Sequence, residues 1–366
     1  MSADAPLIVW LEDDRAGPDL LGGKFGSLAE LVQSGFAVPA GFGITTEAYR
    51  LFVEHEGLKE RVGAALEEAT AGDLEAIERA SEKIAALIRD APMPEALESE
   101  IRSAYAELGE RAGDDRPPVA VRSSCTLEDT EGASFAGQYD TYLWIQGADA
   151  ALEAVRRCWA GLFGPTVLTY DPGGRGGVGV ESATMCVGVQ LMVPARAAGV
   201  AFTLDPVTGD RSKVVIEAVW GLGEGVVSGD VTPDRFRVDK ITLELLAREV
   251  SDKEYEHALD PERAEVRLLP VAADRRNEPC LSDDQVAALA TEAKRIERHR
   301  RAPQDIEWAI DSAGHVHVLQ VRPETVWSRR EVERIMAPGQ TGLQRVLAGF
   351  VPQEHRQTPR SGSKDE

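Results

Sequence analysis

The chain has 366 residues, 43% of them hydrophobic, so it can form two or three domains with buried cores and is not intrinsically disordered. Its formal net charge of −22 argues against nucleic acid or an anionic membrane as a partner, and a polyanionic ligand would need a local basic pocket. The four cysteines have no C-x-x-C spacing, which indicates neither a zinc site nor a disulfide framework. No apolar run of about 18 residues occurs and the N-terminus does not read as a signal peptide, so we expect a soluble, cytoplasmic protein.

Residues 1–180 are expected to form an N-terminal lobe that mixes strands and helices. A short strand over 7–11 precedes a glycine-rich turn and a helix over 24–33. Residues 58–112 are rich in Ala, Glu and Arg with apolar residues at helical spacing, which predicts a helical subdomain. A strand begins at 119–122 and leads into a long polar loop, and such loops between regular elements are often functional.

Residues 181–327 are expected to form a C-terminal lobe made mostly of strands. Alternating or continuous apolar runs predict a mainly antiparallel sheet over 183–193, 197–203, 213–219, 235–239 and a closing hairpin. A helix over 283–300, capped by Ser282, is predicted to cover the sheet. Residues 328–366 are expected to begin as a helix and to end in a disordered polar tail.

The closing hairpin, QDIEWAIDSAGHVHVLQVR over 304–322, is the most informative stretch of the chain. A two-residue turn at Ala313-Gly314 would place Glu307 opposite Gln320, with Cβ atoms about 5 Å apart, and Arg322 on the same face. A carboxylate and an amide oxygen are suitable ligands for Mg²⁺. The alternative is an exposed polar hairpin face without a ligand.

The other face of this hairpin is apolar. The same register would pair Ile306 with Val321 and Trp308 with Leu319 and would be fixed by their burial. Nearby, histidines at 315 and 317 alternate with valines, but no third ligand pattern accompanies them, so we do not expect a zinc site.

Two segments of the first lobe are candidates for phosphate binding. In LGGKFGSLAEL (21–31), glycines, Lys24 and a helix start could receive a phosphate, although a tight turn with a surface lysine is the alternative. In VRSSCTLEDTEGASFAGQYDTYL (121–143), Arg122 ends a strand and could grip a phosphate with two hydrogen bonds or form a structural salt bridge. The glycines and hydroxyl groups that could fold over a ligand are Gly132, Gly137, Ser123, Ser124, Ser134 and Thr141.

Gln190 is a single polar side chain inside the apolar strand GVQLMV (188–193). A buried amide needs partners, so Gln190 either bonds to the backbone or reads an adenine edge. The segments 202–210 and 214–236 place acidic residues and glycines at strand ends, for which simple hairpin turns are the alternative explanation.

Taken together, these segments resemble the N-terminal nucleotide-binding part of the phosphoenolpyruvate synthase and pyruvate phosphate dikinase family, which includes rifampicin phosphotransferase. The matching segments are GGKFGSLAEL with VPAGFGITTEAY, VRSSCTLEDTEGASFAGQYDTYL, DPVTG with GLGEGVVSG, and QDIEWA with LQVRPET. They follow the family's order across nearly all of residues 20–325. The resemblance implies an α/β (α+β), ATP-grasp-like fold, in which an N-terminal lobe and a mostly antiparallel C-terminal lobe clamp ATP.

The resemblance also implies roles for residues that meet the phosphates. Lys24 matches the glycine-loop lysine, and Arg122 matches the arginine of the VRSS segment, which both contact ATP phosphates. Arg322 takes the phosphate-binding position in the hairpin. Gly137 and Thr141 fall on the flexible loop that closes over the triphosphate.

Four further residues match nucleotide or metal positions of the family. Gln190 and its strand lie at the adenine pocket, and Glu217 is a further acidic candidate in the C-terminal lobe. Glu307 and Gln320 match the Mg²⁺-ATP positions, which agrees with the face derived from strand pairing. The implied ligands are therefore ATP and Mg²⁺.

The sequence departs from the family in one respect. Its six histidines lie outside any T-S-H-A type motif, which in the family carries the phosphorylated histidine. We therefore expect the ATP-binding subunit of a split dikinase-like enzyme, resembling the phenylphosphate and 4-methylphenyl phosphate synthases, whose partner subunit brings the histidine and the acceptor site. The alternatives are a fragment of phosphoenolpyruvate synthase or rifampicin phosphotransferase, and a noncatalytic nucleotide-sensing module.

Overall fold

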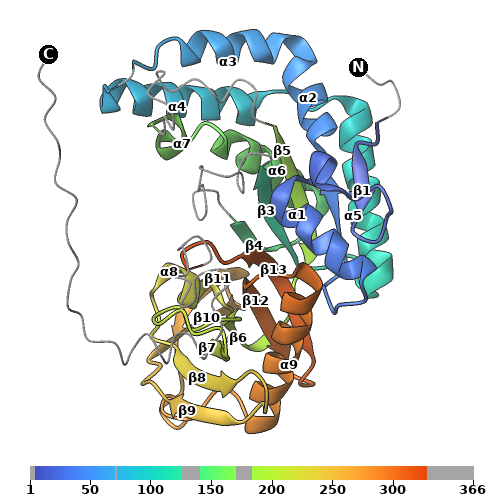
Figure 1. Cartoon of the computed structure of the whole chain (residues 1–366). Coiled ribbons are helices and arrows are strands. Elements are labelled where there is room, and N and C mark those ends of the chain that lie inside the picture. Colours follow the sequence, from blue (N-terminus) through green and yellow to red (C-terminus); the bar gives the residue numbers. More distant parts are fainter. Residues whose placement is uncertain (1–4, 71, 126–140, 170–183, 328–366) are drawn as a thin grey trace, which may run out of the picture. The chain divides into compact units, whose positions relative to one another are not determined.

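A computed structural model describes residues 5–70, 72–125, 141–169 and 184–327 (Figure 1). Two large antiparallel sheets, a two-stranded antiparallel ribbon and the helices that pack on the sheets form most of these residues, so the expected mixed α/β (α+β) class is confirmed. Each sheet contributes to a hydrophobic core of its own. Both sheets belong to one compact unit, residues 1–324.

The first sheet contains five of the described strands. They lie in the order β1 (Ile8–Trp10), β2 (Gly41–Ile44), β5 (Met185–Leu191), β3 (Val119–Cys125) and β4 (Thr141–Ile145), and each neighbouring pair is antiparallel. Because the almost entirely buried β5 pairs with both β2 and β3, the first sheet extends to Leu191. The first sheet therefore continues past residue 180, and the chain enters the second sheet at β6 (Ala195–Phe202).

The subdomain expected over 58–112 is helical, as predicted. It consists of α3 (Leu58–Leu66), α4 (Leu74–Asp90) and α5 (Glu95–Ala112). Their apolar faces pack into the first core together with α2 (Thr46–Glu54), α6 (Ala148–Gly161) and the short α7 (Pro165–Thr169). At the centre of this core the rings of Phe52 and Trp159 stack with centroids 4.7 Å apart.

Helix α1 (Pro18–Gln33) begins earlier than the sequence predicted, with proline at its first turn. The helix is interrupted at Gly22, whose φ of 66° and ψ of −177° are not helical. Near its C-terminal end, Leu31 packs into the second core together with Phe36. The preceding part of α1, from Leu21 to Ala29, packs in a third apolar cluster together with Val9 and Leu11.

The second sheet contains six described strands, and α9 (Asp283–Arg300) covers one of its faces. Their order is β13 (Val316–Pro323), β12 (Gln304–Asp311), β6, β7 (Lys213–Trp220), β8 (Asp234–Asp239) and β9 (Leu245–Glu249). The predicted cap is confirmed, because Ser282 forms a capping box with Gln285. The sequence did not indicate β9 or the ribbon of β10 (Tyr255–Asp260) and β11 (Glu265–Pro270), because charged residues interrupt their apolar pattern. A short helix, α8 (Glu224–Ser228), follows β7.

The hairpin of β12 and β13 differs from the prediction at two points. Its loop is one residue longer, because the Asp311 N–H bonds to the His315 carbonyl and Gly314 adopts a φ of 92°. A β-bulge then leaves Leu319 without an opposite residue, so Trp308 pairs with Val318 and not with Leu319. The longer loop and the bulge shift the register by one residue in opposite directions, so beyond the bulge the pairing agrees with the predicted register.

The pairs that matter for the proposed site are therefore confirmed. Glu307 lies opposite Gln320, and Ile306 lies opposite Val321. Ile306 and Val321 are buried in the second core, as the apolar-face prediction required.

The packing of α1 on the first sheet can be tested at Gly188. A methyl group at this position would overlap the buried Phe25 ring, so we expect Gly188→Ala to lower the free energy of unfolding by about 1–3 kcal/mol. Urea denaturation measures this change. As a matched control, Gly63→Ala in α3 places its methyl in open space and should raise stability by about 0.5–1 kcal/mol. Equal effects of the two substitutions would contradict the packing described.

Candidate active site

The face of the second sheet that does not pack on the second core carries a row of polar side chains. Register places Gln320, Glu307, Val200, Glu217 and Arg235 opposite one another in sequence across five strands. Directly opposed residues project to the same face of a sheet. Strands are spaced about 4.8 Å apart, so the backbones of Glu307 and Glu217 lie roughly 10 Å apart in this row. The sheet therefore aligns two carboxylates that are far apart in the sequence.

Arg122 reaches this row from β3 of the first sheet. Its Nη2 donates to Glu307 Oε2 at 2.8 Å, and its Nη1 donates to the Leu319 carbonyl oxygen at 2.8 Å. The bulge at Leu319 accounts for the second bond, because a bulged residue lies outside the regular ladder. The side chains of Arg122 and Glu307 are only 15% and 22% exposed, so solvent screens the pair weakly. Of the two possibilities for Arg122, the salt bridge is the one that the structure contains.

Arg322 forms a second ion pair on the same face, with a residue that the sequence analysis missed. Its Nε and Nη2 approach Asp305 Oδ2 at 2.7 and 2.6 Å. Burial raises the pKa of Asp305, and the neighbouring Arg322 charge opposes this effect. The sequence did contain a signal for Asp305. This residue precedes Glu307 by two, so it lies on the same face, and the predicted register places it opposite Arg322. Asp305 thus fixes the guanidinium that is expected to meet phosphate.

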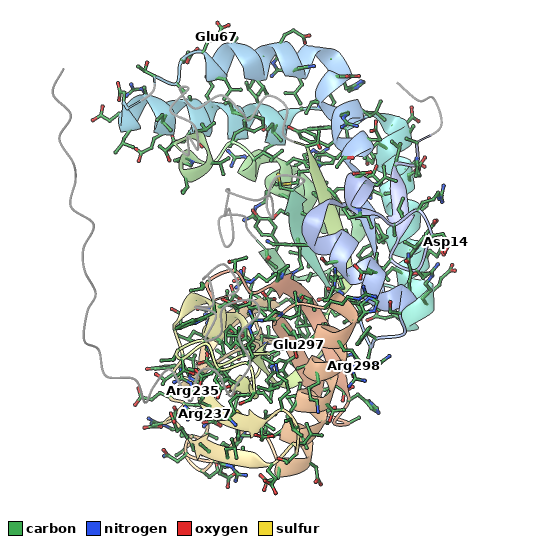
Figure 2. The ribbon with its side chains drawn as sticks, viewed as in Figure 1. Asp14, Glu67, Arg235, Arg237, Glu297 and Arg298 are labelled. Carbon is green, nitrogen blue, oxygen red and sulfur yellow. The ribbon has the colours of Figure 1, made fainter. Side chains whose placement is uncertain are left out.

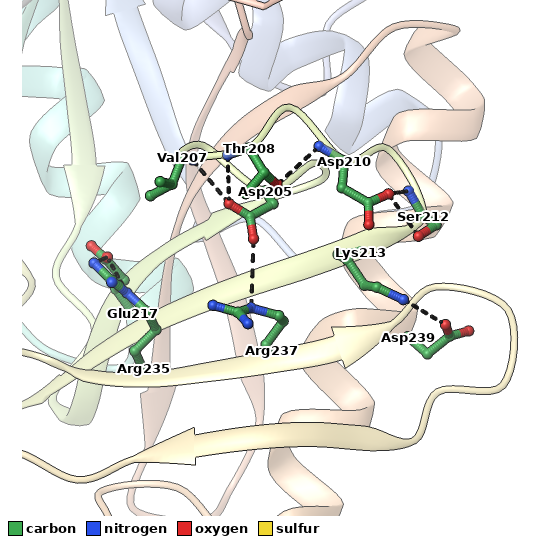
Figure 3. A network of polar contacts seen from close by, with 10 residues as sticks. All are labelled: Asp205, Val207, Thr208, Asp210, Ser212, Lys213, Glu217, Arg235, Arg237 and Asp239. Carbon is green, nitrogen blue, oxygen red and sulfur yellow. Dashed lines mark hydrogen bonds and ion pairs between the residues drawn. The ribbon is translucent and has the colours of Figure 1, made fainter.

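Glu217 is held by Arg235 on the neighbouring strand (Figure 3). Nε and Nη2 of Arg235 donate to Glu217 Oε1 at 3.1 and 2.6 Å. Arg237 lies on the same strand, close to Arg235 (Figure 2), and its Nε lies 3.5 Å from Asp205 Oδ2 (Figure 3). Asp205 also accepts hydrogen bonds from the backbone of its own DPVTG loop, which it shapes. Glu217 and Asp205 are therefore each paired with an arginine of β8.

Lys24 lies in α1, two residues beyond the interruption at Gly22, and is half-buried. The next residue, Phe25, donates its backbone N–H to Ser124 Oγ at 3.1 Å. Ser124 lies two residues after Arg122 on β3. The structure thus ties the Lys24 segment to the strand that carries Arg122.

The remaining predicted site residues occupy three different environments. Gln190 is 2% exposed and its Nε2 donates to the Pro39 carbonyl oxygen at 3.2 Å, so the backbone-bonded alternative describes its amide. Thr141 is exposed, and it lies opposite Arg122 at the start of β4. Gly137, with Gly132 and Ser134, lies outside the described residues.

Two features are absent from the described residues. No helix there is both long and apolar enough to cross a membrane. In the same ranges, no three residues of the types His, Cys, Asp and Glu gather as a metal would need. The predicted metal ligands, Glu307 and Gln320, would not form such a group, because Gln320 is not one of these residue types and would offer an amide oxygen.

A sheet face that brings together a carboxylate, an amide and two guanidinium groups has the chemistry to bind a polyphosphate and indicates an ATP-binding domain. The family described as "Pyruvate phosphate dikinase, AMP/ATP-binding domain" matches residues 18–342, and the chain belongs to this family.

Individual relatives agree with the family. The chain is 41% identical to a phosphoenolpyruvate synthase of Aeropyrum pernix, over 91% of this chain and 44% of the relative. It is 40% identical to a rifampicin phosphotransferase of a Streptomyces species, over 87% of this chain and 36% of that protein. The chain thus spans less than half the length of these curated relatives. Among solved structures, D-alanyl-alanine synthetase A of Vibrio cholerae aligns with 63% of this chain and with 47% of its own length, at 10% identity. The TM-score of 0.26 is too low to support a conclusion about the fold.

The Arg122–Glu307 pair predicts an energetic coupling between the two residues. In a double-mutant cycle of Arg122→Met and Glu307→Gln, we expect a coupling of about 1–3 kcal/mol in urea unfolding, because either single change leaves a poorly hydrated charge. The pair of Lys83 and Glu68 is a suitable control, since its side chains are about half exposed. There the coupling should stay below about 1 kcal/mol. Additive effects at Arg122 and Glu307 would show that the pair does not form.

Asp305 predicts a pH dependence of stability. Its pKa is raised in the folded chain, so the folded state binds more protons than the unfolded state above an ordinary aspartate pKa of about 3.9. The contribution of Asp305 to the free energy of unfolding therefore falls as pH rises from that value through the folded pKa. Asp305→Asn should remove this fall. The stability of the variant relative to the wild type should therefore increase as pH rises from about 3.9 to the pKa of Asp305 in the folded chain. Urea midpoints at several pH values measure this, and a constant difference would contradict it.

Proposed function

We propose that this chain is the ATP-binding subunit of a dikinase-type phosphotransferase, which converts ATP to AMP and phosphate and transfers the β-phosphoryl group to a histidine on a partner subunit. The observation that carries the proposal is the convergence on Glu307. There, Arg122 from the first sheet meets a row that also contains Gln320, with Arg322 held by Asp305 two residues further along. Family membership supports the ATP-binding part of the proposal.

Three cationic side chains neutralise the triphosphate in this proposal. Arg122 and Arg322 present planar guanidinium groups, which can each donate two hydrogen bonds to phosphate oxygens. Lys24 adds a point charge from the interrupted helix α1. Both arginines are paired with carboxylates in the chain alone, so phosphate oxygens compete with Glu307 and Asp305 for the same donors. Before the nucleotide arrives, the two carboxylates hold the guanidinium groups in a fixed orientation.

Glu307 and Gln320 are the residues that would hold Mg²⁺. They fit the ion in donor chemistry, because a hard cation takes carboxylate and amide oxygens, and the register places the two residues opposite each other. Glu307 already has a cationic partner in Arg122, so its carboxylate is placed to meet positive charge. When bound, Mg²⁺ would neutralise charge on the phosphate oxygens.

In the proposed reaction, a histidine nitrogen attacks the β-phosphorus, and the bond between that phosphorus and the oxygen bridging to the α-phosphorus breaks. AMP leaves with this oxygen, water takes the γ-phosphoryl group as phosphate, and the β-phosphoryl group passes from histidine to the acceptor hydroxyl. None of the chain's six histidines lies in a T-S-H-A type motif. Of those described, His299, His315 and His317 are bonded to carboxylates, which supports a histidine from elsewhere.

The acceptor in this proposal is a small molecule with a hydroxyl group, namely a phenol such as phenol or 4-methylphenol. This choice follows from the proposed division between an ATP-binding subunit and an acceptor subunit, an architecture that resembles the aryl phosphate synthases. The second candidate is the ATP-binding part of a longer phosphoenolpyruvate synthase or rifampicin phosphotransferase. The identity to such relatives, of which the chain spans less than half, favours it. In both cases the ATP site is the same, but the acceptor differs.

A pull-down of the tagged chain from its native cells distinguishes the candidates. We expect mass spectrometry to find a separate subunit with a T-S-H-A type histidine, and ³¹P NMR of the complex with ATP and a panel of phenols to show an aryl phosphate. A chain found only within a longer polypeptide, with phosphate transferred to pyruvate or rifampicin, would favour the second candidate. ATP binding without AMP formation under any pairing would indicate a nucleotide-sensing module.

Glu307→Ala tests the role of the carboxylate. We expect it to lower the rate of AMP release by the reconstituted complex at least a hundredfold, because both the proposed metal ligand and the Arg122 partner are lost. Circular dichroism checks that the variant is folded. Glu68→Ala, which changes an exposed carboxylate, should keep the wild-type rate. An unchanged rate for the Glu307 variant would refute the metal assignment.

A further inference from the structure

Helix α1 contains an unusual interruption at Gly22. A continuous α-helix would bond the Leu21 carbonyl to the Phe25 N–H, four residues later. Gly22, between them, adopts a φ of 66°, a conformation that glycine tolerates and other residues rarely adopt. Lys24, the proposed phosphate ligand, lies between Gly22 and Phe25. The interruption therefore shapes the segment that presents this lysine.

A single hydroxyl group from β3 bridges the interruption. Ser124 Oγ donates to the Leu21 carbonyl oxygen at 2.6 Å and accepts from the Phe25 N–H at 3.1 Å. It thus links the two groups that a continuous helix would pair directly. Insertion of a side chain into the helical hydrogen-bond ladder is a known cause of kinks. Ser124 has no solvent exposure, so water cannot easily replace its hydroxyl.

Close packing keeps Gly22 and Ser124 together. A methyl group at Gly22 would overlap both the backbone oxygen and the hydroxyl of Ser124. Arg122 and Ser124 are two residues apart on β3, so they project to the same face of the first sheet. One of them reaches Glu307, and the other holds the Lys24 segment. A single strand thus sets the relative position of two proposed phosphate ligands.

We propose that Ser124 is a positioning residue for the nucleotide triphosphate, because its buried hydroxyl holds α1 open at Gly22 and fixes Lys24 relative to Arg122. This inference rests on the proposed function, in which Lys24 and Arg122 bind phosphate. Ser124 does not contact the ligand in this role. Its own hydrogen bonds to Leu21 and Phe25 account for its donor and one acceptor position, which differs from the direct phosphate contact considered for the loop hydroxyls.

The test is a double-mutant cycle measured as binding of a non-hydrolysable ATP analogue with Mg²⁺, by calorimetry on the whole chain. We expect Lys24→Met to weaken binding, and Ser124→Ala to raise the Kd at least about fivefold, because two buried backbone groups lose their shared partner. In the Ser124→Ala background, Lys24→Met should have much less effect than in the wild type. Ser81→Ala, a buried serine in α4, should leave the Kd unchanged.

The results separate the inference from the function on which it rests. Additive effects of the two substitutions, or an unchanged Kd for Ser124→Ala, would overturn the role of Ser124 while the ATP site stands. Failure of the wild-type chain to bind the analogue would overturn the proposed function as well. If Ser124→Ala does not fold, Gly22→Ala provides the same test from the helix side. It displaces the segment but keeps the hydroxyl, and an unchanged Kd in the folded variant would also overturn the inference.

Discussion

The ion pair between Arg122 and Glu307 is the interaction on which the arrangement of the site depends. It joins β3 of the first sheet to β12 of the second, and both side chains are largely shielded from solvent. Charges in such surroundings require a partner, so the pair constrains both strands. The second bond of Arg122, to the carbonyl of Leu319, makes the bulge in β13 part of the same constraint. A shift of one residue in the hairpin would turn Glu307 away from Arg122.

Antiparallel register is the means by which the chain gathers its polar groups. Glu217 and Glu307 are 90 residues apart in the sequence, yet they share one row because β6 pairs with both of their strands. Each carboxylate in this region has a basic partner: Arg235 for Glu217, Arg122 for Glu307 and Arg322 for Asp305. In a chain with a net charge of −22, this pairing balances the charge of the sheet face locally and keeps three arginines on it.

The first sheet and its helix α1 provide the two cations of the first lobe that are proposed to bind phosphate. Helix α1 brings Lys24, and β3 brings Arg122, with Ser124 connecting the two elements. The ring of Phe25 lies against Gly188 of β5, where no side chain could fit between them. Small residues on the strands and a buried hydroxyl therefore let α1 lie very close to the sheet, next to the apolar cluster that its own side chains form with β1 and β5. Such close contacts allow little movement, which suits a site that must hold ligands in fixed positions.

The helical and strand spacing of apolar residues was sufficient to predict many of the helices and strands. Helical spacing predicted the subdomain over 58–112, Ser282 predicted the start of α9, and the alternation in β12 and β13 predicted which hairpin residues are polar and which are buried. These features depend on residues close in sequence, for which side-chain direction follows directly from backbone geometry. The charged strands β9, β10 and β11 were not predicted, because their alternation is weak and tertiary contacts stabilise them.

Only the tertiary structure decided which distant groups meet. The bulge at Leu319, the placement of β5 in the first sheet and the hydroxyl of Ser124 inside α1 all depend on contacts between segments far apart in the chain. The sequence by itself determined which residues can carry charge, hydrogen bonds or a left-handed backbone. It did not determine whether Arg122 would pair with a carboxylate, because that requires the folded positions of β3 and β12. The physical reason is that side-chain pairing energies depend on distance and burial, which local sequence does not specify.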